Sequence, residues 1–389
     1  IGELMAYTKD EFKQLVDDVQ SQSWYRNPIG FGIARVDRGQ LNKDKILQAT
    51  FPLINWNENF GSAAILLNAL KVAGENVDTS KSELVCKISD AFLTSCVESF
   101  RPYIPEAKGD AHKNVQVIST LASLPIDSGL TAEDYRVVFI FEDAAPESTE
   151  AVYLKLYALS TGKAALRSLN LNGAFGKLHN CAWVGNQPIE LDWLRANEIV
   201  LKLSGKYPNI DFVDKFPRLL QHVILADNTR ILDSGKVRMG AQLAAGTTVM
   251  PGAAYINFNA GTLGSVMVEG RISSSAVVGA GSDVGGGASI LGVLSGTDGV
   301  PVTIGENTLL GANSCTGTAI GDGCILDAGV TILPGTKIAL SDKAVEQLKA
   351  INPGKEISNV MKGSDFQGVN GVHFRVNSST GQTIAMRST

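Results

Sequence analysis

The chain lacks the features that mark several whole classes of protein. It carries 34 lysines and arginines against 39 aspartates and glutamates, a formal net charge of −5 over 389 residues. This balance predicts no basic surface for nucleic acid or for anionic lipid. The longest apolar runs, such as residues 63–70, are far too short to cross a bilayer. We therefore expect neither a nucleic-acid partner nor a membrane span.

Cysteine is also scarce. The five cysteines are an odd number and form no Cys-x-x-Cys pair, which argues against a disulfide framework and against a structural zinc site. The first residues, IGELMAYTKDEF, show no basic region followed by an apolar run, so no secretory signal is expected. Together these observations favour a reduced, cytoplasmic setting.

Aromatic residues and histidine are nearly missing from residues 237–338. This window has two aromatics, Tyr255 and Phe258, and no histidine, yet it holds 21 of the chain's 40 glycines. Aliphatic residues recur in it at intervals of six, which fits neither the period of a helix nor that of a strand. Such hexads predict a parallel β-helix, whose coils have three short sides with one inward aliphatic each. The predicted inward positions are Val237, Leu243, Val249, Ile272, Val278, Val284, Ile290, Ile304, Leu310, Ile320, Leu326, Ile332 and Ile338.

The hexad pattern breaks in three places, and loops on a rigid scaffold often carry functional groups. The longest break covers residues 255–271, the second covers 291–303, and the third is a four-residue step from Thr316 to Ile320. We expect the first break to be an excursion from the coil that carries function. A tolerated insertion remains the alternative for the first two.

The flanking parts show ordinary helix and strand patterns. Thr8-Lys9-Asp10-Glu11 is a capping box that predicts a helix start. Helical spacing also marks residues 62–72, 82–100, 147–159, 190–198 and 342–351. The run YRVVFIF at 135–141 predicts a buried strand, and residues 373–387 predict a hairpin that caps the open end of the β-helix. We predict an α/β domain over 1–225 without a catalytic motif, the β-helix over 226–340, and a C-terminal helix and β module over 341–389.

The missing histidines restrict the chemistry of the coils. Zinc enzymes on such scaffolds need three histidines and some transferases need a histidine base, so the base must be a carboxylate unless His373 folds back, which we do not expect. The window has six acids: Glu269, Asp283, Asp298, Glu306, Asp322 and Asp327. Glu269 differs because it lies in the apolar, glycine-bounded segment MVEGR, where a carboxyl group can act as a base. A surface ion pair with Arg271 is the open alternative.

One long stretch resembles a known family. The run FNAGTLGSVMVEGRISSSAVVGAGSDVGGGASILGVLSG, followed by IGENTLLGANS, resembles the tetrahydrodipicolinate N-succinyltransferases, in their longer actinobacterial and pseudomonad-type form. The resemblance implies a left-handed β-helix between an α/β N-terminal domain and a small β C-terminal domain, in a homotrimer with active sites between subunits. It implies transfer of succinyl from succinyl-CoA to the amino group of tetrahydrodipicolinate, in its ring-opened form 2-amino-6-oxopimelate, during lysine and diaminopimelate synthesis. A hexapeptide-repeat acyltransferase for another acyl-CoA or amine is the alternative, because the scaffold is shared.

The resemblance also assigns site residues. The family's catalytic glutamate falls on Glu269, either as a base that deprotonates the amine or as an acyl-carrying nucleophile, and we favour the base. Some relatives bind magnesium through an acid near a VMHEG segment, where this chain reads VMPGA with Ala253 at the acid's place, so no metal is predicted. Contacts to the CoA moiety fall on Arg271, Gly286, Ser289, Ala312, Asp327, Ala328, Gly335, Lys362, Arg375, Val376, Asn377 and Ser378.

Overall fold

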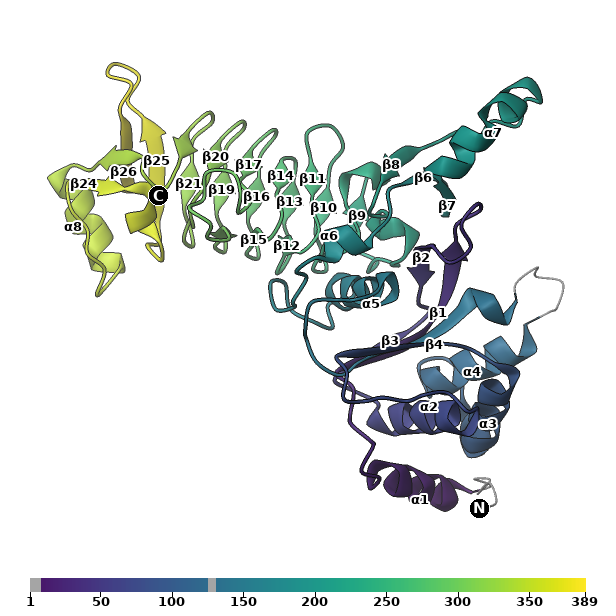
Figure 1. Cartoon of the computed structure of the whole chain (residues 1–389). Helices are drawn as coiled ribbons and strands as arrows, with labels where there is room; N and C mark the ends of the chain where they lie inside the picture. The colour runs from purple at the N-terminus through teal and green to yellow at the C-terminus, as the bar shows by residue number, and fades with distance from the viewer. Residues whose placement is uncertain (1–7, 125–130) are drawn as a thin grey trace. The chain divides into compact units, whose positions relative to one another are not determined.

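The computed structural model describes residues 8–124 and 131–389. The chain forms two compact units, one made of Ile1–Ala158 and Leu169–Phe216, the other of Leu159–Ser168 and Pro217–Thr389. The predicted order of an α/β part, a β-helix and a small β module is confirmed (Figure 1), while the domain boundaries at 225 and 340 stay a prediction. Within the described ranges, no helix combines the length and the apolar character that a bilayer crossing requires.

A five-stranded antiparallel sheet forms the centre of the first unit. Its order is β2-β1-β5-β4, with β3 added to β1. The strands are β1 (Gly30–Arg38), β2 (Ile46–Thr50), β3 (Ile54–Trp56), β4 (Glu83–Lys87) and β5 (Tyr135–Ile140). On one side, Phe31 and Phe139 pack into a core with the helices (Figure 1). These are α1 (Lys9–Gln20), α2 (Phe60–Val72), α3 (Asp90–Phe100) and α4 (Lys113–Ser123), with the short 3-10 helices η1 (Arg101–Glu106) and η3 (Ala132–Asp134).

Helix α5 (Thr149–Ser160) and a second, smaller sheet complete the first unit. Two tyrosines of α5 reach the backbone near β2: the Tyr153 hydroxyl donates to the carbonyl of Leu47 at 3.4 Å, and the amide of Phe51 donates to the Tyr157 hydroxyl at 3.2 Å. The small sheet has the order β7-β6-β8. Its elements are α6 (Ala174–Lys177), β6 (Cys181–Val184), β7 (Gln187–Glu190), α7 (Leu191–Leu203) and β8 (Phe212–Asp214).

Most local predictions for this unit are confirmed. The capping box is formed, because the hydroxyl of Thr8 accepts from the amide of Glu11 and the carboxylate of Glu11 accepts from the amide of Thr8. The strand at 135–141 and the helices at 62–72, 147–159 and 190–198 are present with small shifts at their ends. The helical prediction for 82–100 is wrong in its first half. Strand β4 pairs with β5 there, and the helix begins only after Ser89, whose side chain accepts from the amide of Phe92.

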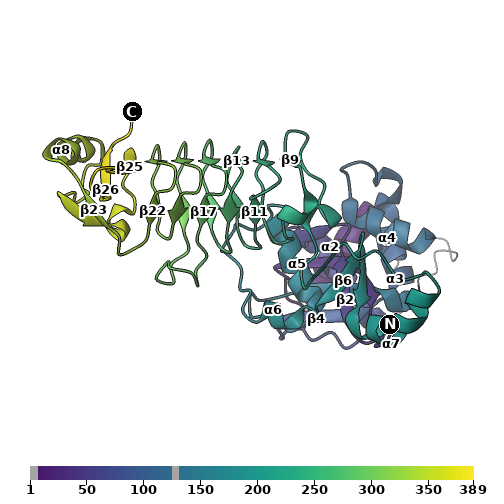
Figure 2. The same ribbon diagram turned by 90° about the horizontal axis from the view of Figure 1, so that it is seen from above.

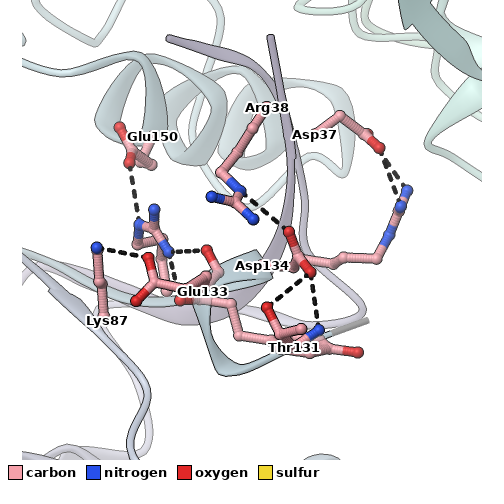
Figure 3. Close-up of polar contacts among 10 residues, drawn as sticks. Asp37, Arg38, Lys87, Thr131, Glu133, Asp134 and Glu150 are labelled. Carbon is pink, nitrogen blue, oxygen red and sulfur yellow. Dashed lines mark hydrogen bonds and ion pairs between the residues drawn. The ribbon is translucent and has the colours of Figure 1, made fainter. Parts of the chain in front are cut away.

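Charged side chains link strands β1 and β4 to η3, and strand β5 to α5 (Figure 3). Arg38 donates to Asp134 at 3.1 Å, and Lys87 pairs with Glu133 at 2.6 Å. Arg136 and Glu150 are both buried, with Nε and Oε1 3.7 Å apart. Burial raises the pKa of Glu150, and this effect exceeds the opposing attraction of Arg136. The cost of burying the Glu150 carboxylate therefore offsets much of the stability that its attraction to Arg136 provides. We assign the whole network of charged residues a structural role.

The second unit is a parallel β-helix with three faces. The first face contains β9 (Arg230–Ile231), β10 (Thr248–Val249), β13 (Met267–Val268), β16 (Asp283–Val284), β19 (Leu309–Leu310) and β21 (Ile325–Leu326). The second face contains β11 (Tyr255–Ile256), β14 (Arg271–Ile272), β17 (Ser289–Ile290), β20 (Cys315–Thr316) and β22 (Thr331–Ile332). The third contains β12 (Gly261–Thr262), β15 (Val277–Val278) and β18 (Thr303–Ile304). Figure 2 shows β11, β17 and β22 in succession along the prism. The 3-10 helix η4 (Leu219–Gln221) precedes β9, and the 3-10 helix η5 (Ser234–Lys236) follows it.

The predicted inward ladder is confirmed. All the predicted inward residues except Leu243 are buried, and Leu243 packs against the same core while partly exposed. Most inward residues of the coils pair in register with the one a coil away, as Val268 does with Val249 and Val284. The core of the coils therefore consists of aliphatic side chains stacked along the prism.

The prediction that residues 255–271 leave the coil is wrong, because this segment is itself a complete coil. Its inward positions are Ile256, Thr262 and Val268, all buried and spaced by six. Threonine at one of these positions and the four-residue step from Val268 to Ile272 hid the pattern in the sequence. The hydroxyl of Thr262 accepts from the amide of Ala244 at 3.1 Å and shares a hydrogen bond with the hydroxyl of Thr247 at 2.8 Å. The polar group is thus satisfied inside an otherwise apolar ladder.

The other two breaks have the expected form. A loop leaves the coil after β17 and returns at β18, with Leu294 almost fully exposed and Thr297 buried. The four-residue step after Thr316 is a tight corner, since the hydroxyl of Thr316 donates to the carbonyl of Thr318 at 2.7 Å. Ile320 then pairs with Ile304 and continues the third face.

The C-terminal module closes one end of the prism, as predicted. Strand β25 (Val372–Val376) pairs in parallel with β21, which places His373 beside Ile325. Strand β26 (Thr383–Arg387) then pairs antiparallel with β25 and forms the predicted hairpin. The remaining elements are β23 (Lys337–Ala339), α8 (Asp342–Ile351), β24 (Val360–Lys362) and the 3-10 helix η6 (Gly363–Phe366). The edge of the first face is therefore covered by the chain itself.

The inward threonine generates a stability prediction. We expect Thr262→Val to lower the free energy of unfolding by about 1–2 kcal/mol, although valine is more apolar, because the amide of Ala244 loses its acceptor. Urea unfolding followed by circular dichroism would measure the change. The outward Thr331→Val on β22 is the control and should leave the midpoint unchanged. A more stable Thr262→Val protein would contradict the assignment of the hydroxyl pair.

Candidate functional site

The candidate site lies along one edge of the prism, where the first face turns into the second. We call this the site edge. Its corners follow Val249, Val268, Val284, Leu310 and Leu326. Three of these corners have the regular length, since the next inward residue comes six positions later. The corner of Glu269 is two residues shorter, because Ile272 follows Val268 by four positions.

Glycine makes the short corner possible. A Cβ atom on Gly270 would lie 2.3 Å from the carbonyl oxygen of Ala288 and 2.8 Å from that of Gly285. The chain therefore passes directly over the next coil, and its backbone bonds follow this path: Glu269 donates to Val284 and Arg271 donates to Ala288, both at 2.8 Å. At this level the chain takes a shorter path from the first face to the second than it does in the coils that follow.

A hollow of about 450 Å³ lies at the short corner. Glu269 contributes to its wall, with residues of the coil before it and of the two coils after it. Gly286 leaves the hollow open toward the carboxylate, since a Cβ atom there would lie 3.8 Å from Oε2 of Glu269. Gly287 is restricted by its positive φ of 72° and by Asn313, so a side chain is disfavoured there too. The other lining residues are Met250, Pro251 and Ala253.

The Glu269 side chain is half-buried and is free of ion pairs among the described residues. Arg271 does not neutralise it. The guanidinium of Arg271 instead donates through Nε to the hydroxyl of Ser289 at 2.9 Å. This contradicts the alternative of a surface Arg271–Glu269 pair. The carboxylate is thus available to a ligand in the hollow.

Several predicted contact residues follow the same edge. Gly286, Ala312, and Asp327 with Ala328 occupy the next three corners in turn, and Arg271 and Ser289 begin strands of the adjoining second face. The corner of Asp327 is three coils beyond that of Glu269, about 14 Å at the usual spacing of strands. The structure therefore arranges these residues as one track that begins at Glu269.

The far end of the track carries a charged cluster. His373 Nε2 lies 2.6 Å from Oδ1 of Asp327, and Arg375 Nε donates to Oδ2 at 2.9 Å. Partial burial works against ionisation of Asp327, but the hydrogen bonds and charges of His373 and Arg375 prevail and lower the pKa of this carboxyl. The cluster joins two predicted contact residues, Asp327 and Arg375, through direct contact.

Other predicted contacts lie away from the site edge. Gly335 is in the turn between β22 and β23, and Lys362 is on β24, paired with Lys337 of β23. The amide of Gly363 donates to the carbonyl of Thr336 at 2.9 Å. Their chain neighbours Lys362 and Gly335, the two predicted contact residues, therefore lie close to each other. Val376, Asn377 and Ser378 begin the exposed turn of the β25–β26 hairpin.

Three features of the site were missed in the sequence. His373 was not expected to fold back, but the pairing of β25 with β21 brings it against the last coil. It lies beside Asp327 and not in the hollow of Glu269. Pro251 and Asn313 line the hollow from neighbouring coils, and only the register of the coils could have placed them there. Among the described residues, no group of three or more His, Cys, Asp or Glu side chains is placed to hold a metal ion, and the prediction of no metal site stays a prediction.

Comparisons with known proteins relate both ends of the chain to one family of succinyltransferases. Residues 10–176 match the family described as tetrahydrodipicolinate N-succinyltransferase N-terminal, and residues 178–218 match the middle region of the same family. Residues 301–334 match the hexapeptide repeat of succinyl-transferase. The first two matches fall within residues 1–225, where the sequence offered no catalytic motif.

Individual relatives cover nearly the full length. A 2,3,4,5-tetrahydropyridine-2,6-dicarboxylate N-succinyltransferase of Sulfurovum sp. (strain NBC37-1) is 66% identical over 382 residues, 98% of this chain and 95% of that protein. The protein of the same name from Campylobacter jejuni is 54% identical over 384 residues, 98% and 96% of the two chains. A crystal structure described as a putative 2,3,4,5-tetrahydropyridine-2-carboxylate N-succinyltransferase from Campylobacter jejuni matches with a TM-score of 0.93 and 53% identity, covering 98% of each chain.

The charged cluster generates a pH prediction. Because the pKa of Asp327 is lower in the folded state, its contribution to stability is present above the ordinary carboxyl pKa and is lost as pH falls through the folded-state value. The side chain is 36% exposed, so the contribution is at most about 1 kcal/mol. Asp327→Asn should lower the melting temperature at pH 7, and the difference should shrink toward pH 3. The exposed Asp298→Asn is the control, and a pH-independent difference would count against the cluster.

Proposed function

Because the chain belongs to the tetrahydrodipicolinate N-succinyltransferase family, we propose that it transfers succinyl from succinyl-CoA to the amino group of tetrahydrodipicolinate. The acceptor reacts in its ring-opened form, 2-amino-6-oxopimelate, and CoA is released, in lysine and diaminopimelate biosynthesis. The observation that carries the proposal is the half-buried Glu269 in the hollow of the short corner, beside a track of family contact residues. An acyltransferase for another acyl-CoA or amine is the second candidate, because the scaffold itself does not select the substrate.

Glu269 acts as the general base in this proposal. The acceptor amine arrives as an ammonium ion and must lose a proton before its nitrogen can attack. A carboxylate without an internal cation partner can take that proton. The nitrogen then attacks the thioester carbonyl, the new C–N bond forms, the C–S bond breaks, and the CoA thiolate leaves. Direct attack needs deprotonation and alignment, so a covalent acyl intermediate on Glu269 is not required.

The track along the site edge suits an extended acyl donor. Glycine and alanine at its corners, Gly286, Ala312 and Ala328, let a ligand lie close to the backbone. Arg271 and Arg375 supply exposed positive charge for anionic groups. We assign Gly335, Lys362 and the hairpin residues Val376, Asn377 and Ser378 to the phosphate-bearing end of the donor, by family resemblance. Succinyl-CoA is the co-substrate, and no metal is required.

The proposal extends to assembly and location. The outward side chains of the first face include Met267, Leu309 and Ile325, an apolar surface that suits burial against another subunit. A homotrimer with sites shared between subunits, located in the cytoplasm, is the arrangement we propose. The domain division at 225 and 340 belongs to the same proposal.

The substrate pair provides the direct test. We expect CoA release, followed with a thiol reagent, when succinyl-CoA and tetrahydrodipicolinate are supplied together. Acetyl-CoA, and unrelated amines in place of tetrahydrodipicolinate, should react at least about 100-fold more slowly, the size of discrimination that several specific contacts provide. Efficient turnover with another pair, and none with this one, would favour the second candidate.

Removal of the base generates a second prediction. Glu269→Gln should lower kcat by about 100-fold or more, because the amide has nearly the same shape but cannot accept the proton. Binding of CoA, measured by calorimetry, should change little. Glu306→Gln, at an exposed corner away from the site edge, is the matched control. Near-normal activity of Glu269→Gln would remove Glu269 from the mechanism.

Assembly is tested separately. Light scattering on the purified chain should give about three times the mass of 41.2 kDa calculated from the sequence. Leu309→Asp on the first face should weaken the assembly, because it places a charge in the apolar contact. A fully active monomer would contradict the shared-site arrangement.

A further inference from the structure

Asp283 lies beside the candidate base, on the next coil. It is the outward residue of β16 and pairs in register with Met267 of β13. Its neighbour in the chain, Val284, points inward and accepts a backbone hydrogen bond from the amide of Glu269 at 2.8 Å. Asp283 is therefore fixed by the strand ladder next to the short corner, on the first face where that face meets the site edge.

The immediate surroundings of Asp283 are apolar. Along the first face it lies between Met267 on one coil and Leu309 on the next. The side chain is half-buried and has no hydrogen bond or ion pair among the described residues. Burial raises the pKa of Asp283, and the negative charge of Glu269 raises it further. Among the described residues, Glu269 is the group whose charge acts on Asp283, and both neighbouring coils present apolar side chains there.

A carboxylate in this position weakens the fold. It loses hydration without gaining a partner, and it is repelled by a second carboxylate. An apolar side chain, like those before and after it on this face, would be more favourable for the coil alone. A cation supplied by a ligand would reverse this balance, because two adjacent carboxylates attract one positive charge more strongly than a single carboxylate does.

We propose that Asp283 binds the ammonium group of the acceptor and holds it beside Glu269. This inference rests on the proposed amine acylation and names a residue that the family resemblance did not assign. One N–H of the ammonium donates to Asp283, which remains ionised. A second N–H faces Glu269, which removes that proton and frees the nitrogen lone pair. Asp283 thus contributes to acceptor binding and orientation, and Glu269 takes the proton.

The protons and bonds balance in this scheme. Glu269 gains the first proton when the amine becomes neutral. The nitrogen then bonds to the thioester carbon and the C–S bond breaks. The second proton passes from the nitrogen to the leaving thiolate, which departs as the thiol. Glu269 returns its proton to solvent, and Asp283 carries the same charge at the start and at the end.

The test compares Asp283→Asn with wild type and with the control Glu306→Gln. Asparagine keeps the shape of the side chain but loses the charge, so the coil should fold, and the melting temperature should be equal to or higher than that of wild type. The KM for tetrahydrodipicolinate should rise by about 10- to 100-fold, the effect of losing a charge-assisted hydrogen bond. The KM for succinyl-CoA should stay within about two-fold of wild type, since binding of the donor does not involve Asp283.

A pH profile distinguishes binding from structure. In wild type, protonation of Asp283 should weaken acceptor binding as pH falls, starting at a higher pH than for an ordinary aspartate. In Asp283→Asn, the KM for the acceptor should be nearly independent of pH over that range. Equal losses for both substrates together with a lower melting temperature, or an unchanged acceptor KM, would overturn the proposal. Wild-type turnover with the same substrate pair tests the proposed function independently of Asp283.

Discussion

Vertical pairing between coils is the constraint on which the second unit depends. Each strand of the β-helix consists of two or three residues, too few for a stable strand by itself. Stability comes from the next coil, which supplies both the hydrogen-bond partners and the inward side chain that stacks on its equivalent. This pairing fixes which residue lies above which, whatever the number of residues in the corners between the faces.

The candidate site depends on this variation in the number of residues at the corners. Between Val268 and Ile272 the chain is two residues shorter than at the regular corners of the same edge, yet both residues keep their place in the ladder. The shortening is absorbed by Gly270, whose missing side chain allows contact with the backbone of the next coil. The result is a hollow in the wall of the prism, with a carboxylate at its margin. The same rigid ladder then presents small corner residues and a terminal charged cluster along one line.

The sequence allowed much of this architecture to be predicted, because an aliphatic residue every six positions has few other structural explanations. It was less informative wherever an inward position carries a polar residue. Thr262 is as buried as its aliphatic neighbours, but its hydroxyl interrupted the pattern and made a regular coil look like an excursion. The sequence placed Glu269 in an expected loop, whereas the structure places it in a shortened corner of a regular coil.

Contacts between distant parts of the chain were beyond the sequence patterns. The pairing of β25 with β21 joins residues nearly fifty positions apart, so nothing local indicated that His373 and Arg375 would reach Asp327. The family resemblance named Asp327 and Arg375 separately and did not indicate that they contact each other. Asp283 was counted among the acids of the coils, but its proximity to Glu269 depends on the register of two strands.

The loop between β17 and β18 shows what this independence of corner length means for the evolution and engineering of the fold. Twelve residues separate Ile290 from Thr303, yet Ile304 pairs with Val278 and with Ile320 as though the corner were of ordinary length. The number of residues in one corner therefore does not change the strand pairing of the coils that follow. Such a corner is an insertion site, at which a foreign peptide, a reporter or a new recognition loop can be introduced while the coils of the prism keep their pairing.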